Sequence, residues 1–278
     1  MSDTLLSVEN LRVTYPTRKG PAEVVRGVSF TLGRERLAIV GESGSGKSQT
    51  GRAILGLTPK PGIVTADKLS FDGIDLRGAK PRQWRALRGA RMSMVMQDPK
   101  FSLNPVMTVG AQIMEALAFH GRSSRAEKRD RALAMLEAVQ IRDPKRVFDA
   151  YPHEISGGMG QRVMIAMMLV AEPDLMIADE PTSALDVTVQ VEVLRILDQL
   201  VSEKGMGLVF ISHDLRLVST FCDRVLVMYA GRVVEELKAS ELHRAQHPYT
   251  RGLISCLPEI DTDVRPLPTL DRDASWAL

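Results

Sequence analysis

Residues Gly41–Ser48 read Gly-Glu-Ser-Gly-Ser-Gly-Lys-Ser, a complete match to the pattern G-x-x-x-x-G-K-[ST]. The apolar run Leu37–Val40 before the motif suits a buried strand, and Gln49–Leu57 after it has the apolar spacing of a helix. Glycines let such a loop curl so that its backbone N–H groups point at phosphate oxygens, and the helix N-terminus adds partial positive charge. In this setting the motif predicts a phosphate cradle for a nucleotide, in preference to a glycine-rich turn without a ligand.

Two side chains of the cradle have expected roles. The Lys47 ammonium is expected to reach the β- and γ-phosphates, and the Ser48 hydroxyl can ligate Mg²⁺. We expect the nucleotide to contact a continuous segment that includes the first residue after the motif: Gly41, Glu42, Ser43, Gly44, Ser45, Gly46, Lys47, Ser48 and Gln49.

The composition predicts a soluble, cytoplasmic protein. The chain has 278 residues, and its formal net charge of +2 offers no electrostatic case for a nucleic-acid partner. No secretory signal pattern is visible at the N-terminus, and the longest apolar run, Val163–Ala171, is too short to span a bilayer. The only cysteines, Cys222 and Cys256, lack metal spacing and are interpreted as reduced thiols.

Strands and helices alternate along most of the chain, which predicts an α/β fold with a mainly parallel sheet. Strands over residues 5–14 and 24–32 predict an N-terminal antiparallel β subdomain. Residues 101–153 differ, because they carry an apolar helix over 109–119 and a second helix that starts at the capping box Ser124–Glu127. We therefore expect an inserted helical subdomain.

The C-terminal part continues the alternation. Residues 224–229 and 232–235 predict two strands joined by the turn Ala230-Gly231, and a helix is expected from about Ser240.

Polar side chains follow several predicted strands at their carboxyl ends. Gln97, His213 and the pair Asp179-Glu180 each come directly or almost directly after an apolar strand. Ligands of α/β sheets bind at this edge, so we expect these side chains near the phosphates. Asp179 would hold Mg²⁺, directly or through water, and Glu180 would polarise the attacking water. An acid pair that only caps a helix is the structural alternative.

These motifs together resemble the ATP-binding cassette (ABC) ATPases over nearly the whole chain. Five elements follow the Walker A loop in the family's order: the Q-loop Gln97, the signature Ile155–Met159, the Walker B strand Leu175–Asp179 followed by Glu180, the D-loop Ser183–Asp186 and the switch histidine His213. Six elements in the right order and spacing are highly specific.

The resemblance also bears on Tyr15. Residue type alone leaves ordinary strand packing equally open, since aromatics are common in strands. The resemblance assigns Tyr15 to the aromatic that stacks on adenine.

The resemblance implies that two cassettes pair head to tail around two ATP molecules. In that arrangement Ser156, Gly157 and Gly158 bind the γ-phosphate held by the opposite subunit, and Asp186 contacts the partner. His213 would hold the γ-phosphate and the attacking water in geometry. The implied catalytic residues are Lys47, Gln97, Glu180 and His213, and the implied metal ligands are Ser48, Gln97 and Asp179.

The resemblance also implies a domain layout. The catalytic core would span 1–100 and 154–240, the helical subdomain 101–153, and a C-terminal extension 241–278. Gln97 would join the core to the helical subdomain and sense Mg²⁺.

Within the family, the chain is similar to the importers of dipeptides, oligopeptides and nickel. The features behind this are Met159 with the following Gln161-Arg162, the turn Asn104-Pro105, the segment His247–Arg251 and the later Leu257-Pro258. Gly160 departs from the branch, which generally has arginine there. Many members continue into a cysteine-bearing tail with an iron–sulfur cluster; here only Cys256 lies near that region, so we expect no such cluster.

We therefore expect an ATPase subunit of an ABC importer for peptides or related small solutes. Its expected partners are two integral-membrane permease subunits, a second ATPase subunit and, indirectly, a solute-binding protein, with no nucleic acid. It would lie on the cytoplasmic side of the inner membrane.

Three other kinds of ABC protein are alternatives. The first is an exporter or a non-transport ABC ATPase, for instance one coupled to carbon–phosphorus bond metabolism. The second, a DNA-repair or chromosome-organising ATPase, would need a long coiled coil or a zinc module between Gln97 and Ser156, where neither is present. The third, a regulatory cassette without hydrolysis, would need a broken catalytic set.

Overall fold

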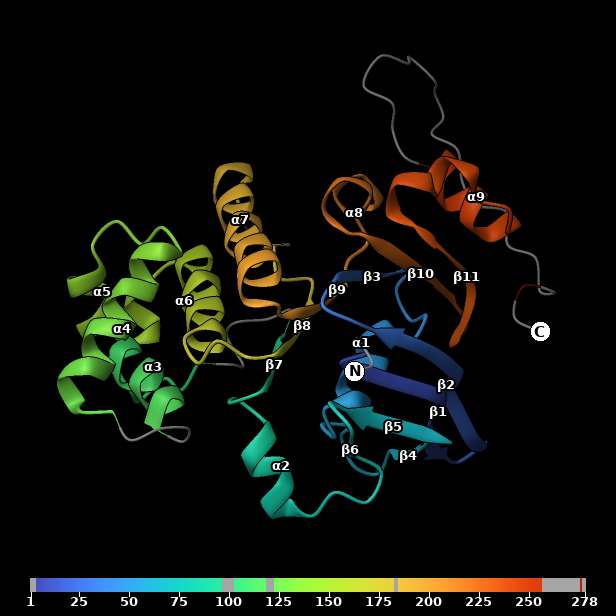
Figure 1. Ribbon diagram of the computed structural model, residues 1–278, viewed down its shortest axis with the longest axis horizontal. Coiled ribbons are helices and arrows are strands. Elements are labelled where there is room, and N and C mark those ends of the chain that lie inside the picture. Colours follow the sequence, from blue (N-terminus) through green and yellow to red (C-terminus); the bar gives the residue numbers. More distant parts are fainter. Residues whose placement is uncertain (1–3, 97–102, 119–122, 183–184, 257–275, 277–278) are drawn as a thin grey trace. The chain divides into compact units, whose positions relative to one another are not determined.

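The computed structural model describes residues 4–96, 103–118, 123–182, 185–256 and 276 (Figure 1). The chain forms two compact units. The first combines Met1–Gly78 with Val209–Leu278, and the second comprises Ala79–Leu208.

The first unit begins with an antiparallel sheet. Its strand order is β2 (Gly20–Leu32), β1 (Leu6–Thr17), β5 (Lys68–Phe71) and β6 (Ile74–Asp75), and β4 (Ile63–Thr65) also pairs with β1. The register sets Leu6 opposite Leu32 and Val13 opposite Val25. All four of these side chains are buried. Leu6 and Val13 are an odd number of residues apart, and the register shift between Val8 and Leu11 is what allows both to face the core.

A second set of strands in this unit carries the phosphate-cradle motif. Strand β3 (Arg36–Val40) leads into α1 (Lys47–Ile54), which packs on β1 and β2. Strand β10 (Arg224–Tyr229) runs parallel to β3 and antiparallel to β11 (Arg232–Lys238). The remaining elements are β9 (Gly207–Ile211), α8 (Leu215–Phe221), the 3₁₀ helix η3 (Ala239–Arg244) and α9 (Pro248–Ser255). Residues 37–40 of β3 are fully buried, as expected for a strand covered on both faces.

The second unit is mainly helical. Its elements in chain order are α2 (Pro81–Leu87), β7 (Met92–Val95), α3 (Val109–Ala118), α4 (Arg125–Ala138), α5 (Pro144–Asp149), η2 (Pro152–Glu154), α6 (Gly157–Leu169), β8 (Leu175–Asp179) and α7 (Val187–Lys204). Strands β7 and β8 pair in parallel, with Met92 opposite Leu175.

Helices α3, α4 and α5 pack together, and α3 and α4 also contact α6 (Figure 1). Their shared core includes Ile113, Leu136, Val147 and Val163, all fully buried. Gly110 of α3 lies so close to α5 that a Cβ atom there would come within 2.4 Å of the Phe148 ring. The small residue therefore lets these two helices pack closely.

The predicted fold class is confirmed: an α/β chain with an antiparallel N-terminal sheet, a parallel-rich second sheet and inserted helices. Three local expectations were wrong. Helix α1 begins at Lys47 rather than at Gln49, the segment from Ala239 is a short 3₁₀ helix, and α8 was not anticipated. In α8 the Asp214 side chain accepts hydrogen bonds from two backbone N–H groups, which starts a helix too short for a periodic pattern.

The predicted boundaries at 100, 153 and 240 stay predictions. Among the described helices, none combines the length and the hydropathy that crossing a bilayer requires.

We expect Ser124→Ala to loosen the N-terminus of α4. The Ser124 Oγ accepts from the Glu127 N–H at 3.2 Å, and the Glu127 carboxylate accepts from the Ser124 N–H at 2.7 Å, so the predicted capping box is present. Loss of such a cap should speed hydrogen–deuterium exchange of the α4 amides about fivefold. Ser202→Ala is the control, because this hydroxyl caps no helix and donates only to the Asp198 and Gln199 carbonyls of its own helix α7. Unchanged exchange in α4 would contradict the role of the cap.

Candidate nucleotide-binding site

The loop between β3 and α1 has a shape that only glycine permits at two positions. Gly41 has φ 148° and Gly46 has φ 100°. A Cβ atom on Gly41 would lie 2.2 Å from the Met228 carbonyl oxygen, and one on Gly46 would lie 2.6 Å from the Val24 carbonyl oxygen. The loop backbone is thus pressed against β10 and β2, and side chains are excluded there.

A second contact holds the loop in place. The Gly231 N–H, in the turn between β10 and β11, donates to the Ser45 carbonyl at 3.0 Å. Ser45 is buried, whereas Ser43 and Gly44 are exposed at the tip of the loop. The tip of the loop, Ser43 and Gly44, is therefore open to solvent, while Ser45 is held against the turn between β10 and β11.

Lys47 is the central charge of this loop. Its side chain is almost fully buried, and its Nζ donates to the carbonyl oxygens of Gly41 at 2.7 Å and Glu42 at 2.8 Å. Burying an ammonium group is costly unless oxygen acceptors surround it, and here the curled loop supplies them. The Lys47 ammonium therefore lies within the loop between β3 and α1, and its contact with phosphate stays a prediction.

Tyr15, predicted to contact adenine, lies beside the start of α1. Its Oη donates to the Gln49 Oε1 at 3.0 Å, which joins two of the predicted contact residues. A Cβ atom on Gly62 would come within 2.8 Å of the Tyr15 ring, so the ring is closely backed there. Stacking on adenine stays a prediction.

His213 is the second residue after β9 and is exposed. The preceding Ser212 N–H donates to the Ile39 carbonyl of β3 at 3.3 Å, two residues before Gly41. His213 therefore follows a residue that is bonded to the end of β3, and its approach to the phosphates stays a prediction.

Asp179 and Glu180 belong to the second unit, so their approach to Lys47 and Ser48 stays a prediction. Asp179 ends β8 and is 3% exposed, while Glu180 is half-buried with φ 51°. A positive φ is unfavourable for glutamate, and such strain concentrates at functional turns. Directly after it, the Pro181 carbonyl accepts from the Gln161 Nε2 at 2.6 Å.

The signature residues form the start of α6. The Ser156 side chain accepts from the Met159 N–H at 3.4 Å, and Gly157 and Gly158 make the first turn. Ser156 and Gly157 are both exposed. An exposed helix N-terminus of this kind presents backbone N–H groups to an anion.

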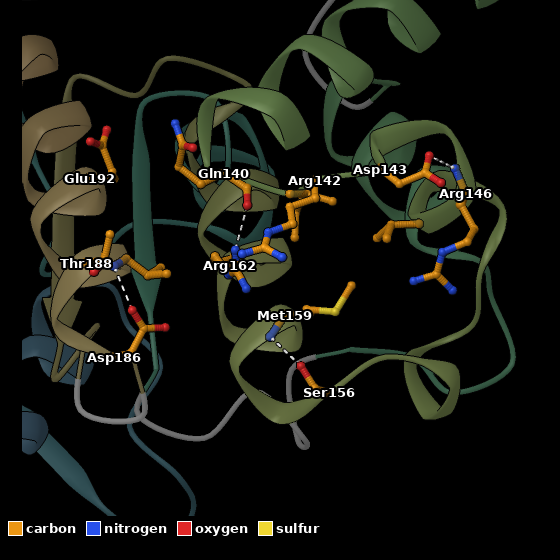
Figure 2. A pocket seen from close by; sticks show the side chains of 13 residues that line it. Gln140, Arg142, Asp143, Arg146, Ser156, Met159, Arg162, Asp186, Thr188 and Glu192 are labelled. Atoms are coloured by element: carbon orange, nitrogen blue, oxygen red, sulfur yellow. Dashed lines mark hydrogen bonds between the residues drawn. The ribbon is translucent and has the colours of Figure 1, made fainter.

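Asp186 caps the start of α7 as Ser156 caps the start of α6, because its side chain accepts a hydrogen bond from the Val189 N–H at 3.1 Å. Ser156 and Asp186 border one cavity, together with Met159 and Arg162 (Figure 2). The volume of this cavity is about 630 Å³. Three guanidinium groups line it: Arg142, Arg146 and Arg162.

Arg162 is held in this cavity by its environment. Its guanidinium donates to the Gln140 carbonyl at 2.6 Å, and burial lowers the pKa of this group from its usual value. The carboxylates of Asp143, Asp186 and Glu192 line the same cavity. The sequence did not predict this cluster of charges, because its arginines come from two separate segments, residues 140–147 and helix α6. The roles of Ser156 and Asp186 at a nucleotide stay predictions.

The predicted metal ligands are Ser48, Gln97 and Asp179. Among the described residues, no three His, Cys, Asp or Glu side chains gather into a metal-binding group. The predicted donors Ser48 and Asp179 offer hydroxyl and carboxylate oxygens, which suit Mg²⁺ bound mainly through substrate phosphates and water. Gln97 and the D-loop residues Ser183 and Ala184 lie outside the described residues.

The two cysteines are free thiols. Cys222 is buried, and burial raises the pKa of its thiol to about 12, which keeps it protonated and unreactive.

Sequence reasoning noted Tyr249 only as part of the segment His247–Arg251 and missed its contact with the loop. Its phenol oxygen accepts from the Glu42 N–H of the loop at 2.9 Å, although the two residues are 207 positions apart. No local pattern signals such a contact, because the segment around Tyr249 reads only as a short helix.

Several known proteins resemble this chain in sequence, and several solved structures resemble it in fold. The profile of the family described as ABC transporter matches residues 25–183. The dipeptide transport ATP-binding protein DppD of Haemophilus influenzae is 47% identical over 257 residues, which cover 92% of this chain and 78% of that protein. The oligopeptide transport ATP-binding protein OppD of Salmonella typhimurium is 45% identical, with 94% and 78% covered.

Solved structures agree. The dimeric structure of MJ0796, a bacterial ABC transporter cassette, has a TM-score of 0.77 at 28% identity and covers 84% of this chain and 99% of its own. The same cassette bound to ADP and phosphate after hydrolysis has a TM-score of 0.76 at 29% identity, with the same coverage.

Replacing Gly44 or Gly46 by alanine should distinguish the cost of a steric clash from the cost of backbone strain. A Cβ atom in Gly46→Ala meets the Val24 carbonyl, whereas one added at Gly44, with φ 83°, would have nothing within 4 Å. We expect Gly44→Ala to lower the free energy of unfolding by about 1–2 kcal/mol and Gly46→Ala by about 2–5 kcal/mol, measured by urea denaturation. Equal losses in the two variants would contradict the close approach of β2.

Proposed function

The chain belongs to the ABC transporter family, and from this premise we propose that it is the ATP-hydrolysing subunit of an importer of peptides or related small solutes. The observation that carries the proposal is the conformation of the loop between β3 and α1. This loop requires glycine at two positions, and its carbonyl oxygens accept hydrogen bonds from the buried Lys47 ammonium. Such a loop has little use other than binding phosphate, because it concentrates positive charge and N–H donors in one place.

ATP would enter with its phosphates in this loop. The backbone N–H groups and the start of α1 would bind the phosphate oxygens, and Lys47 would bridge the β- and γ-phosphates. Tyr15, already joined to Gln49 at the start of α1, would stack on the adenine. Ser48, Gln97 and Asp179 would hold Mg²⁺, which when bound neutralises phosphate charge.

Hydrolysis would depend on Glu180 and His213. The Glu180 carboxylate would accept a proton from the attacking water, and His213 would hold the γ-phosphate and that water in line. Support for the first role comes from the strained, half-buried position of Glu180 directly after the buried strand β8.

A second cassette would complete each site. Ser156, Gly157 and Gly158 present the exposed N-terminus of α6, and Asp186 borders the same cavity (Figure 2). We assign these residues to the ATP bound by the partner cassette. ATP would then clamp the pair together, and loss of the γ-phosphate would open it.

The transport role follows from the relatives. The names of the similar proteins specify dipeptide or oligopeptide transport, and the match covers more than nine-tenths of this chain. We propose two permease subunits and a solute-binding protein as partners, with this chain peripheral to the cytoplasmic face of the membrane.

We also propose that Gln97 links the catalytic core to the helical subdomain, with the domain boundaries at residues 100, 153 and 240.

Reconstitution tests this proposal directly. The chain, its partner ATPase and the permeases in proteoliposomes should import a peptide when ATP and the solute-binding protein are present. Copurification with soluble metabolic enzymes in place of permeases would favour the alternative, a non-transport ABC ATPase such as one in carbon–phosphorus metabolism.

Glu180→Gln should keep ATP binding and lose hydrolysis about 10²–10⁴-fold, because an amide cannot accept the proton from water. Phosphate release by the assembled transporter measures the loss, and the exposed Glu203 of α7 gives the control Glu203→Gln. Near-normal turnover of Glu180→Gln would exclude its role as the base.

Lys47→Ala should abolish tight ATP binding, because the phosphate charge loses its main counter-charge. Isothermal titration calorimetry measures the affinity, and Lys204→Ala, at the exposed end of α7, is the matched control. Affinity retained by Lys47→Ala would contradict the proposed binding mode.

A further inference from the structure

The peptide group that joins Gly41 to Glu42 is held at both of its polar atoms. Its carbonyl oxygen accepts from the Lys47 Nζ at 2.7 Å. Its N–H donates to the phenol oxygen of Tyr249 at 2.9 Å. One holder is the catalytic lysine of the motif, and the other comes from the C-terminal helix α9.

The orientation of this peptide group is not determined by the loop sequence. Gly41, with φ 148°, adopts a conformation open to glycine, and glycine permits wide rotation of the peptide that follows it. A rotation of that peptide would turn the carbonyl away from Lys47 and leave the buried ammonium with one acceptor fewer. The phenol favours the orientation in which the carbonyl points at Lys47.

Tyr249 is itself firmly placed. Its side chain is fully buried, and its ring packs against Tyr229 of β10 with ring centroids 4.5 Å apart. Trp276 contacts the same pair, with centroids 5.9 Å from Tyr249 and 6.0 Å from Tyr229. The phenol therefore has little freedom to follow a loop that moves.

The start of α9 is anchored to β11. The Glu235 carboxylate accepts from the Gln246 N–H at 2.7 Å and from the His247 N–H at 3.3 Å. The His247 Nδ1 then accepts from the Tyr249 N–H at 3.2 Å. A continuous set of hydrogen bonds thus leads from strand β11 through the start of α9 to the cradle.

We propose that Tyr249 is a positioning residue for Lys47, so that helix α9 forms part of the nucleotide site and sets its affinity for the phosphates of ATP. This inference rests on the proposed function, because it assigns Lys47 to phosphate binding. Tyr249 acts through the Gly41–Glu42 peptide and not by touching the nucleotide. Any partner or modification that displaces α9 would then weaken ATP binding at the cradle.

The test compares Tyr249→Phe with Tyr229→Phe. The first variant removes the hydroxyl that holds the Glu42 N–H and keeps the buried ring, whereas the second removes a hydroxyl from the neighbouring ring. We expect Tyr249→Phe to raise the Kd for Mg-ATP about three- to tenfold, the scale of one hydrogen bond, and Tyr229→Phe to leave it within about twofold.

Two further readouts distinguish positioning from general destabilisation. Hydrogen–deuterium exchange without nucleotide should rise over residues 41–48 in Tyr249→Phe only, while the thermal midpoints of both variants stay close together. An unchanged Kd and unchanged exchange in Tyr249→Phe would overturn the inference, and so would equal losses in both variants. Failure of the wild-type chain to bind Mg-ATP would instead refute the proposed function, and this inference with it.

Discussion

The nucleotide cradle depends on the burial of one ammonium group. Lys47 is 7% exposed, so its charge needs oxygen acceptors from the protein. The loop provides them by curling until two of its own carbonyl groups point inward at 2.7 and 2.8 Å. The curled backbone thus supplies the acceptors that the buried cation needs, and in the proposed function the same loop binds the phosphates.

That shape is stabilised from outside the motif. The Val24 and Met228 carbonyls leave no room for side chains at Gly46 and Gly41, and the Gly231 N–H holds the Ser45 carbonyl. Tyr249 holds the remaining polar atom of the first peptide. Strands β2 and β10, the turn after β10 and helix α9 therefore all contact the loop, so its shape depends on segments far from the motif in the sequence.

Much of this architecture could be predicted from the sequence, because local rules govern it. Alternation defined β1 and β2, the capping box placed the start of α4, and the motif placed the Lys47 ammonium. The errors have local causes too. Helix α8 is a single cap followed by seven residues, and α1 starts two residues early because Gly46 can adopt a left-handed conformation.

The sequence by itself determined the phosphate loop, the alternation of strands and helices, and the resemblance to a family, since each is a pattern of neighbouring residues. Only the tertiary structure decided that Arg142, Arg146 and Arg162 share one cavity with Ser156 and Asp186. It also decided that Tyr249 meets Glu42, 207 residues away. A contact between distant segments depends on where the packed core carries each of them, and no local spacing encodes that position.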